Sequence, residues 1–269
     1  MVKPTIALLT DFGLTDNYVG IMKGVILAIN PEARLVDLTH EIEVQNVFQA
    51  ALVLKSAYRY FAKGTIFLCV VDPGVGSLRQ AIIVQAGEHF FVGPDNGIFS
   101  FVVAEQKTIR IWTITNVRYF LNPVSRTFHG RDIFAPVAAH LSKGTTPGRF
   151  GPRQTGLVRL AWPRPKISKD GREILGQIVD IDRFGNLITN IENEKVLAWS
   201  GKMVVIIKGR KIGRIAMSYT EGKNGELLAL PGSKDLLEIS VNRGSAQKAL
   251  HGQRGDLVRI SSFAREKWK

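Results

Sequence analysis

Charged side chains lie beside glycines in four short segments where the sequence could perform chemistry: residues 10–16 (TDFGLTD), 72–79 (DPGVGSLR), 125–132 (SRTFHGRD) and 181–186 (IDRFGN). The two carboxylates of the first segment could accept hydrogen bonds from vicinal ribose hydroxyls. The glycines of the second segment let the backbone approach a ligand closely. Each segment also has an ordinary structural interpretation: a helix cap at Asp11 and Asp16, a salt bridge between Asp72 and Arg79, a structural role for His129, and a hairpin turn at residues 181–186.

Sequence motifs for metal binding and for the familiar nucleophiles are absent. No HExxH or CxxC spacing involves the histidines, so we expect no zinc site: His40, His89, His129, His140 and His251. There is no GxSxG elbow and no Walker loop. Residues 11–13 (DFG) match the kinase magnesium motif, but no catalytic loop precedes them. The sequence therefore predicts a site without a metal.

The first 72 residues alternate between strand and helix patterns. Apolar runs predict strands at residues 5–10, 34–38 and 65–71, and helical spacing predicts helices at residues 17–29, with Asn17 as the cap, and 46–61. This alternation indicates right-handed βαβ units and a parallel sheet covered on both faces. Ligands gather at the carboxyl ends of such strands, where Asp11 and Asp72 lie. Further strands are expected at residues 81–85, 89–92 and 108–113, and a helix at 131–142.

The pattern changes after residues 162–165 (WPRP), which we interpret as a linker. Short strands separated by glycine-containing turns are predicted at residues 173–182, 203–208, 210–217, 226–230, 236–241 and 256–260. Such spacing is typical of a small antiparallel barrel. The predicted fold class is α/β, with an N-terminal α/β domain (residues 1–163) whose mostly parallel sheet is sandwiched by helices. A smaller C-terminal antiparallel β-barrel (residues 173–269) follows.

The composition is that of an ordinary globular protein. The 269 residues are 45% hydrophobic and 22% charged, which excludes global disorder and allows a well-buried core. No apolar run is long enough for a secretory signal or a membrane span, and the single Cys69 suits a reducing cytoplasm, so we predict a cytoplasmic protein with no membrane partner. A net charge of +13 would suit nucleic-acid binding, but the basic residues are dispersed and no nucleic-acid-binding motif is present. We therefore expect a basic surface and no nucleic-acid partner.

Taken in order, the motifs resemble one enzyme family. TDFG near the start is followed by VDPGVG, PDNG, TFHGRD, IDRFGN and LPGSKDLLEISVN. Together they resemble the SAM hydroxide adenosyltransferase family, hydrolases of S-adenosyl-L-methionine (SAM) that are related to the fluorinases and chlorinases. The match runs from Thr10 to about Asp256. It implies a homotrimer in which each site lies between the N-terminal domain of one subunit and the C-terminal domain of its neighbour.

The resemblance also implies roles for individual residues. The catalytic positions of the family fall on Asp72, Arg79 and His129, and its ribose-binding aspartate falls on Asp11. The nucleoside-contacting positions fall on Asp182, Phe184, Asn186, Tyr219, Ser233, Glu238 and, through its backbone, Val241, while Asp16 and Phe128 would line the site. The chain departs from the halogenases in its short connection from Arg79 to Phe91, in Asp72, and in Tyr18.

These observations predict hydrolysis of SAM to adenosine and L-methionine. A sulfonium leaves as a neutral thioether, so the enzyme needs to align and partly deprotonate a water. We expect Asp72 to orient the water, Arg79 to stabilise its hydroxide character and His129 to complete the proton path, with SAM as substrate and no cofactor. Two alternatives remain: halide-dependent 5′-adenosyl transfer, and a non-catalytic protein that binds adenosine or SAM.

Overall fold

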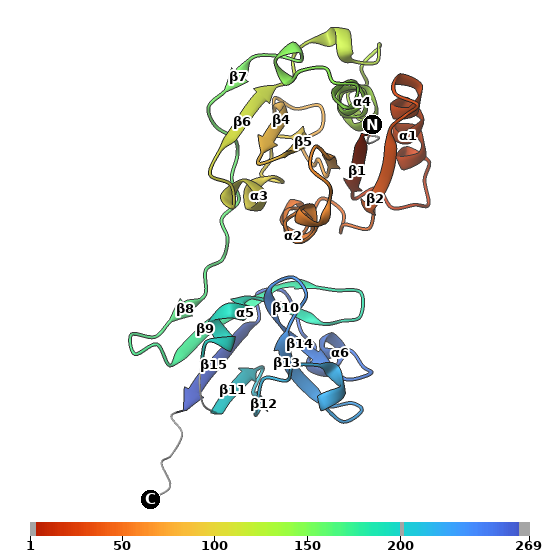
Figure 1. Ribbon diagram of the computed structural model, residues 1–269. Helices are drawn as coiled ribbons and strands as arrows, with labels where there is room; N and C mark the ends of the chain where they lie inside the picture. Colours follow the sequence, from red (N-terminus) through yellow and green to blue (C-terminus); the bar gives the residue numbers. More distant parts are fainter. Residues whose placement is uncertain (1–3, 200–201, 264–269) are drawn as a thin grey trace, which may run out of the picture. The chain divides into compact units, whose positions relative to one another are not determined.

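The computed structural model describes residues 4–199 and 202–263, which divide into two compact units, Met1–Ala161 and Trp162–Lys269 (Figure 1). The predicted domain ranges also include residues 1–3, 200–201 and 264–269, which lie outside the described residues. Within the described ranges, no helix is both long enough and apolar enough to cross a membrane.

A seven-stranded sheet forms the centre of the first unit, in the order β2-β1-β3-β5-β4-β6-β7. Strands β2, β1, β3, β5 and β6 run in one direction, whereas β4 and β7 run in the other, which confirms the mostly parallel sheet. The strands are β1 Thr5–Thr10, β2 Arg34–Thr39, β3 Ile66–Val70, β4 Ala81–Ala86, β5 His89–Pro94, β6 Ile109–Thr113 and β7 Arg153–Gln154.

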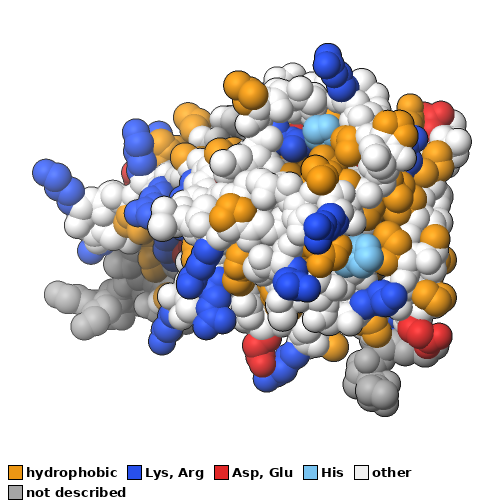
Figure 2. All heavy atoms as spheres, turned by 90° about the horizontal axis from the view of Figure 1, so that it is seen from above, with side chains coloured by type: hydrophobic (Ala, Val, Ile, Leu, Met, Phe, Trp, Pro, Cys, Tyr) orange, Lys and Arg blue, Asp and Glu red, His pale blue; other side chains and the backbone are white. Residues whose placement is uncertain are grey.

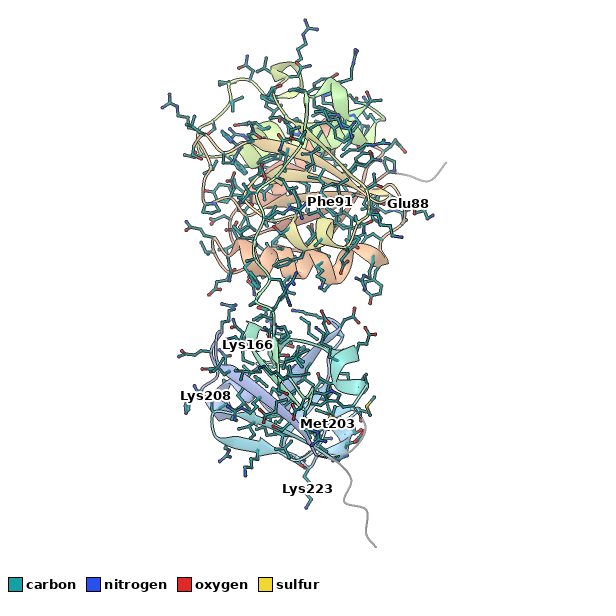
Figure 3. All side chains as sticks on the ribbon, turned by 90° about the vertical axis from the view of Figure 1, so that its left-hand side faces the viewer. Glu88, Phe91, Lys166, Met203, Lys208 and Lys223 are labelled. Carbon is teal, nitrogen blue, oxygen red and sulfur yellow. The ribbon has the colours of Figure 1, made fainter. Side chains whose placement is uncertain are left out.

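Helices cover both faces of this sheet, as predicted. Successive residues of β1 point to opposite faces, so Ile6 and Leu8 enter one core cluster while Ala7 and Leu9 enter another. The first cluster includes residues of α1 (Tyr18–Ile29) and α4 (Ala135–Ser142), and the second includes residues of α2 (Val47–Ala57) and α3 (Ser100–Ala104). Figure 3 shows Phe91 of β5 inside this unit and Glu88, in the preceding turn, at its surface.

Two helix ends differ from the predictions. Asn17 precedes α1, but its side chain makes no capping hydrogen bond, whereas Asn46 caps α2 by accepting from the amide of Gln49 at 2.9 Å. The helix predicted for residues 131–142 begins as a π-helical segment, Gly130–Phe134, immediately after His129. Such segments often occur at functional sites. Short 3-10 turns lie at Tyr58–Tyr60, Val117–Tyr119, Pro147–Arg149 and Tyr219–Glu221.

The second unit is an antiparallel, nearly closed barrel, as predicted. Its path is β12-β11-β15-β9-β10-β14-β13, with β8 beside β9. A bridge joins Ile215, in the segment after β12, to Ala229 of β13. The elements are β8 Lys166–Ile167, β9 Glu173–Ile181, β10 Leu187–Glu192, α5 Asn193–Leu197, β11 Lys202–Ile207, β12 Arg210–Ile212, β13 Leu227–Pro231, β14 Leu236–Val241, α6 Ala246–Leu250 and β15 Leu257–Phe263.

The sequence pattern gave no prediction of β10, and the strand predicted for residues 210–217 is shorter, Arg210–Ile212. Strand β10 contains two buried polar residues, which break the apolar pattern. Thr189 donates its hydroxyl to the Leu237 carbonyl at 2.8 Å, and the Asn190 side chain accepts from the amide of Gln177 at 2.8 Å. These bonds satisfy the buried polar atoms, which is why such residues fit in the core.

Candidate functional site

A cavity of about 300 Å³ opens at one edge of the first unit's sheet. Strands β1 and β3 are parallel neighbours, with Thr10 beside Val70, so the segments that follow them meet at the same edge. The segments after β1, β2 and β3 line the cavity together with residues that precede α4. Four predicted site residues are among its lining: Asp11, Asp72, Phe128 and His129.

Asp72, Arg79 and His129 form one hydrogen-bonded cluster. Arg79 Nε donates to both Asp72 carboxylate oxygens at 3.0 Å, and Arg79 Nη2 donates to Asp72 Oδ2 at 2.5 Å. The same Nη2 lies 2.7 Å from His129 Nδ1. The side chains of Asp72 and Arg79 are 5% and 11% exposed, and the guanidinium lies over the Phe134 ring, 5.3 Å from its centroid. The salt bridge considered from the sequence therefore exists, and it also includes the histidine.

The contact with Arg79 fixes the protonation of His129. A guanidinium can only donate, so Nδ1 must accept and the neutral ring carries its hydrogen on Nε2. Burial and then the positive charge of Arg79 lower the pKa of His129 below its ordinary value, against the opposing effect of Asp72 and Asp132. His129 is therefore a neutral imidazole on the cavity wall.

Arg79 itself is not among the residues that line the cavity. It lies behind Asp72 and His129 and bonds to both, so its charge acts on the cavity through them. The loop between Asp72 and Arg79 depends on Gly76, whose φ of +77° is in the left-handed region and whose Cβ position would lie 2.5 Å from the Arg126 carbonyl oxygen. A side chain at this position would push apart the two segments that bear the cluster.

Asp11 does not cap α1. Its Oδ2 accepts from the backbone amide of Gln45 at 2.8 Å, across the cavity wall from β1 to the segment after β2. Among the described residues, no group donates to the other oxygen, Oδ1. The helix-cap interpretation of Asp11 is thus wrong, and one carboxylate oxygen is available to a ligand.

Aromatic side chains form another part of the cavity wall. The Phe128 ring lies 5.9 Å from Phe12 and 5.1 Å from Tyr18, both edge-on. The segment that bears Phe128 is held by Asp132, which is 1% exposed, accepts from Arg131 Nε at 2.6 Å and accepts from the Ser125 amide at 2.7 Å. The cavity wall therefore combines aromatic rings with the carboxylates of Asp11 and Asp72.

A second cavity, of about 470 Å³, lies on the barrel unit. Its lining includes four predicted site residues together with two that the sequence analysis did not select: Phe184, Asn186, Tyr219 and Val241, with Arg243 and Gly244. Arg243 directly follows the SVN motif and has a φ of +55°, which is a turn conformation. The sequence NRG at residues 242–244 is the signal from which this turn could have been predicted.

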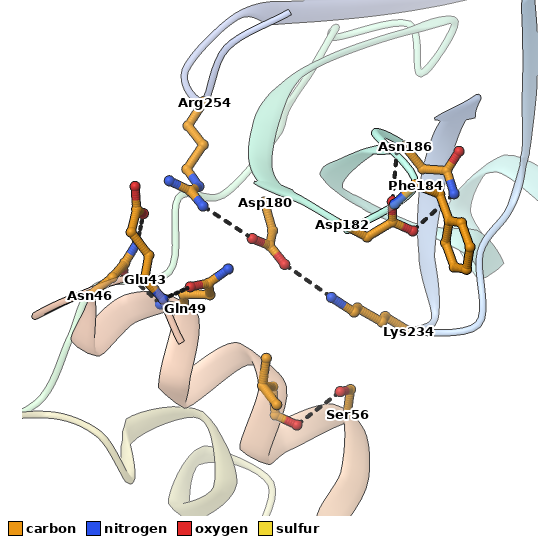
Figure 4. Close-up of polar contacts among 11 residues, drawn as sticks. Glu43, Asn46, Gln49, Ser56, Asp180, Asp182, Phe184, Asn186, Lys234 and Arg254 are labelled. Carbon is orange, nitrogen blue, oxygen red and sulfur yellow. Dashed lines mark hydrogen bonds and ion pairs between the residues drawn. The ribbon is translucent and has the colours of Figure 1, made fainter. Parts of the chain in front are cut away.

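Asp182 folds the turn that presents Phe184 to this cavity. Its Oδ1 accepts from the amides of Phe184 and Asn186 at 2.9 Å, and its Oδ2 accepts from Asn186 Nδ2 at 2.9 Å (Figure 4). The turn joins β9 to β10, so the hairpin interpretation is also correct. Gly185 is required here because its φ is +82° and a Cβ would meet the Ser245 hydroxyl. The Phe184 ring is 76% exposed.

Tyr219 and Glu238 form a pair beside the second cavity. The Tyr219 hydroxyl donates to Glu238 Oε1 at 2.6 Å, and the Ser240 hydroxyl donates to the same oxygen at 2.6 Å. Partial burial and this carboxylate raise the pKa of Tyr219 to about 12. The phenol therefore stays protonated at neutral pH and can hold Glu238 in one orientation.

Asp16 and Ser233 are exposed and lie outside the lining of both cavities, so their assigned roles stay predictions. Ser233 precedes Lys234, whose ammonium donates to the buried Asp180 at 3.0 Å, and Arg254 lies 3.5 Å from that carboxylate (Figure 4). This ion pair fixes the turn that bears Ser233. Within the part of the chain that the structure describes, no three His, Cys, Asp or Glu side chains gather as metal ligands.

Family profiles match both units. The SAM hydroxide adenosyltransferase N-terminal domain matches residues 6–151, and the C-terminal domain of the same family matches residues 176–259. The chain belongs to this family. The resemblance seen in the motifs is confirmed, and the site residues lie within the two matched ranges.

Curated relatives and a solved structure are similar to this chain over nearly its full length. A protein of Thermus thermophilus named (R)-S-adenosyl-L-methionine hydrolase is 37% identical over 94% of this chain and 97% of its own length. A protein of the same name from Methanocaldococcus jannaschii is 35% identical over 95% of each chain. An uncharacterized conserved protein of Thermotoga maritima has a crystal structure that superimposes with a TM-score of 0.89 at 39% identity, covering 95% of this chain and 99% of that one. Proteins named fluorinase are more distant, as with one from Nocardia brasiliensis at 24% identity.

Proposed function

We propose that this enzyme hydrolyses SAM to adenosine and L-methionine by attack of water at the ribose 5′ carbon. The observation that carries the proposal is the Asp72–Arg79–His129 cluster, whose carboxylate and imidazole line the cavity of the first unit. Membership of the family and curated relatives named SAM hydrolase support the same reaction.

The reaction balances without an added acid or cofactor. A bond forms between the water oxygen and C5′, the C5′–sulfur bond breaks, and sulfur keeps the electron pair, so methionine leaves as a neutral thioether. One proton of the water remains on the 5′ hydroxyl of adenosine and the other is released. The enzyme's contribution is to align a poor nucleophile opposite the bond that breaks and to receive that proton.

The cluster divides these tasks. Asp72 accepts a hydrogen bond from the water and orients its lone pair towards C5′. Neutral His129, whose Nδ1 is occupied by Arg79, donates its Nε2–H to the same water and holds it in place, while Asp72 receives the released proton and passes it to solvent. Arg79 keeps both groups in place and stabilises hydroxide character through them. A buried carboxylate at this wall also disfavours a halide, because it would place two anions in contact.

We also propose that both cavities contribute to one substrate site, built between subunits of a homotrimer. Asp11 would bind the ribose hydroxyls, and the barrel cavity would bind the nucleoside through Phe184 and Asn186. Support comes from exposed apolar side chains that an assembly would cover. Val44 at 74% and Phe184 at 76% exposure line the two cavities, and Leu14 at 67% and Leu78 at 102% lie in the segments that follow β1 and β3. The fully buried Cys69 suits the cytoplasmic location that we propose.

Subunit mixing tests the shared site. Asp72→Asn removes the carboxylate of the first unit, and Asn186→Ala removes an amide of the second. Each variant alone should be nearly inactive, and mixed trimers formed after dissociation and reassembly should regain turnover, because some sites then combine two intact halves. Sedimentation of an active monomer, or mixed trimers without recovered turnover, would contradict the shared site.

Chromatography of the enzyme incubated with SAM tests the reaction itself. We expect adenosine and methionine in equal amounts, at a rate unaffected by added fluoride or chloride. A 5′-halogenated nucleoside would indicate the halide-dependent alternative. Tight binding of SAM without any product would indicate a non-catalytic binding protein.

A further inference from the structure

A buried histidine outside the Asp72–Arg79–His129 cluster lies directly behind the Asp11 loop. His40 follows β2, and its side chain is 1% exposed. Both ring nitrogens are occupied: Nδ1 lies 2.8 Å from Thr10 Oγ1, and Nε2 lies 3.0 Å from Asp37 Oδ1. This ring has no role in the proposed hydrolysis, so its two hydrogen bonds must serve another purpose.

The bonds of His40 belong to a chain that joins three elements. Lys23 of α1 donates to Asp37 Oδ2 at 2.7 Å, which keeps that carboxylate as an acceptor for His40 Nε2–H. In the neutral ring Nδ1 is then an acceptor, so the Thr10 hydroxyl donates to it. Thr10 Oγ1 in turn accepts from the amide of Phe12 at 3.3 Å. Thr10 ends β1 and is fully buried, so its hydroxyl has one orientation.

These hydrogen bonds hold the backbone in place on both sides of Asp11. The Thr10 hydroxyl fixes the residue before Asp11 and the amide after it, and the His40 carbonyl accepts from the Gly13 amide at 2.8 Å. The carboxylate is oriented separately by the Gln45 amide, which donates to Oδ2, and Asp11 is among the residues that line the cavity. Recognition of two ribose hydroxyls by one carboxylate tolerates an error of only about 0.5 Å, so the backbone beneath it must be rigid.

We propose that His40, acting through the Thr10 hydroxyl, is a positioning residue that sets the ribose selectivity of Asp11. The proposal rests on the proposed function, because it assumes that Asp11 binds the ribose. Loss of the Thr10 hydroxyl releases the Phe12 amide and one nitrogen of His40, and the Asp11 loop then samples several positions. Discrimination between ribose and 2′-deoxyribose falls, while the Asp72–Arg79–His129 cluster stays intact.

The matched pair Thr10→Val and Thr10→Ser tests this. Valine has the shape of threonine without the hydroxyl, whereas serine keeps the hydroxyl. Calorimetric titration with adenosine and 2′-deoxyadenosine should give a preference of roughly tenfold for adenosine in the wild type and in Thr10→Ser. The preference should fall to within about threefold in Thr10→Val. With SAM, Thr10→Val should raise KM by a larger factor than it lowers kcat.

Thr65→Val is the control, because it removes another buried threonine hydroxyl of the same unit, one that donates to the Ala62 carbonyl at 2.7 Å. It should leave the nucleoside preference at the wild-type value. A ratio of affinities does not depend on the folded fraction, so mere instability of Thr10→Val cannot imitate the result. In an Asp11→Asn background, Thr10→Val should cause no further change in the ratio.

The outcomes separate two failures. A wild-type enzyme that turns over SAM, together with a Thr10→Val variant of unchanged nucleoside preference, overturns the positioning role alone. A wild type that neither hydrolyses SAM nor binds adenosine overturns the proposed function and this inference with it.

Discussion

Replacing Arg79 by methionine should destabilise the first unit strongly, because it leaves the charge of Asp72 buried without its partner. The two side chains are 11% and 5% exposed and approach to 2.5 Å. Removing one member of a pair buried to this degree costs about 3–5 kcal/mol. In domains of about 150–250 residues each kcal/mol lowers the melting temperature by about 2–4 °C. The expected decrease is therefore roughly 6–20 °C.

Scanning calorimetry of single and double variants measures this coupling. The control is Lys63→Met, which breaks the ion pair with Glu88 (Figure 3) in the same unit. That pair has a similar distance, 2.8 Å, but its side chains are 79% and 59% exposed, so we expect little change. A decrease confined to Arg79→Met would separate burial from the mere presence of an ion pair.

The double variant decides the origin of the effect. Adding Asp72→Asn to Arg79→Met removes the orphaned charge, so the double variant should melt at a higher temperature than Arg79→Met alone. Such recovery is the signature of two directly coupled residues. If the losses of the two single variants simply add, the buried charge is not the cause and the reasoning is refuted.

Three further predictions concern the site of the first unit. Asp11→Asn should reduce the roughly tenfold preference for adenosine over 2′-deoxyadenosine, since a neutral amide loses less when one hydroxyl is missing; calorimetry showing an unchanged preference would remove Asp11 from ribose recognition. The rate should stay constant as the pH falls to about 6.5, the ordinary pKa of histidine, and should decrease only below that pH, because burial and Arg79 lower the pKa of His129 and the neutral ring is the active form. A rate that begins to decrease above about pH 6.5 would contradict this assignment. Gly76→Ala should reduce turnover at least tenfold, because the new Cβ would lie 2.5 Å from the Arg126 carbonyl oxygen. The control is Gly64→Ala, where φ is a similar +82° but no atom lies near the Cβ position; it should lower stability by only about 1 kcal/mol and leave the kinetics unchanged.

Much of this fold could be predicted from the sequence because its signals are local. The apolar runs of β1 and β3 and the helical spacing of α1 and α2 depend on neighbours a few residues away. Placing Asp11 and Asp72 at one edge needed only the rule that parallel strands end together. Strand β10 was missed because the polar Thr189 and Asn190 are satisfied by hydrogen bonds to the neighbouring strands β14 and β9, which the apolar pattern of β10 itself does not record.

Site residues that belong to a sequence motif could be predicted, whereas residues whose role depends on tertiary contacts could not. The grouping of Asp72, Arg79 and His129 followed from resemblance, but the neutral state of His129 depends on its burial and on the contact with Arg79. Gln45 enters the cavity wall because its amide meets Asp11, and His40 acquires its role through Thr10. Both pairs span about thirty residues of sequence, so local periodicity contains no trace of them.

The central claim is that water attacks the ribose 5′ carbon at the Asp72–Arg79–His129 cluster. Hydrolysis of SAM in water enriched in ¹⁸O, followed by mass spectrometry of both products, tests it most directly. We expect one ¹⁸O atom in the 5′ hydroxyl of adenosine and unlabelled methionine. The Asp72→Asn variant should form adenosine at a rate reduced ~10²–10⁴-fold. Adenosine without the label, or an Asp72→Asn variant that turns over at the wild-type rate, would contradict it.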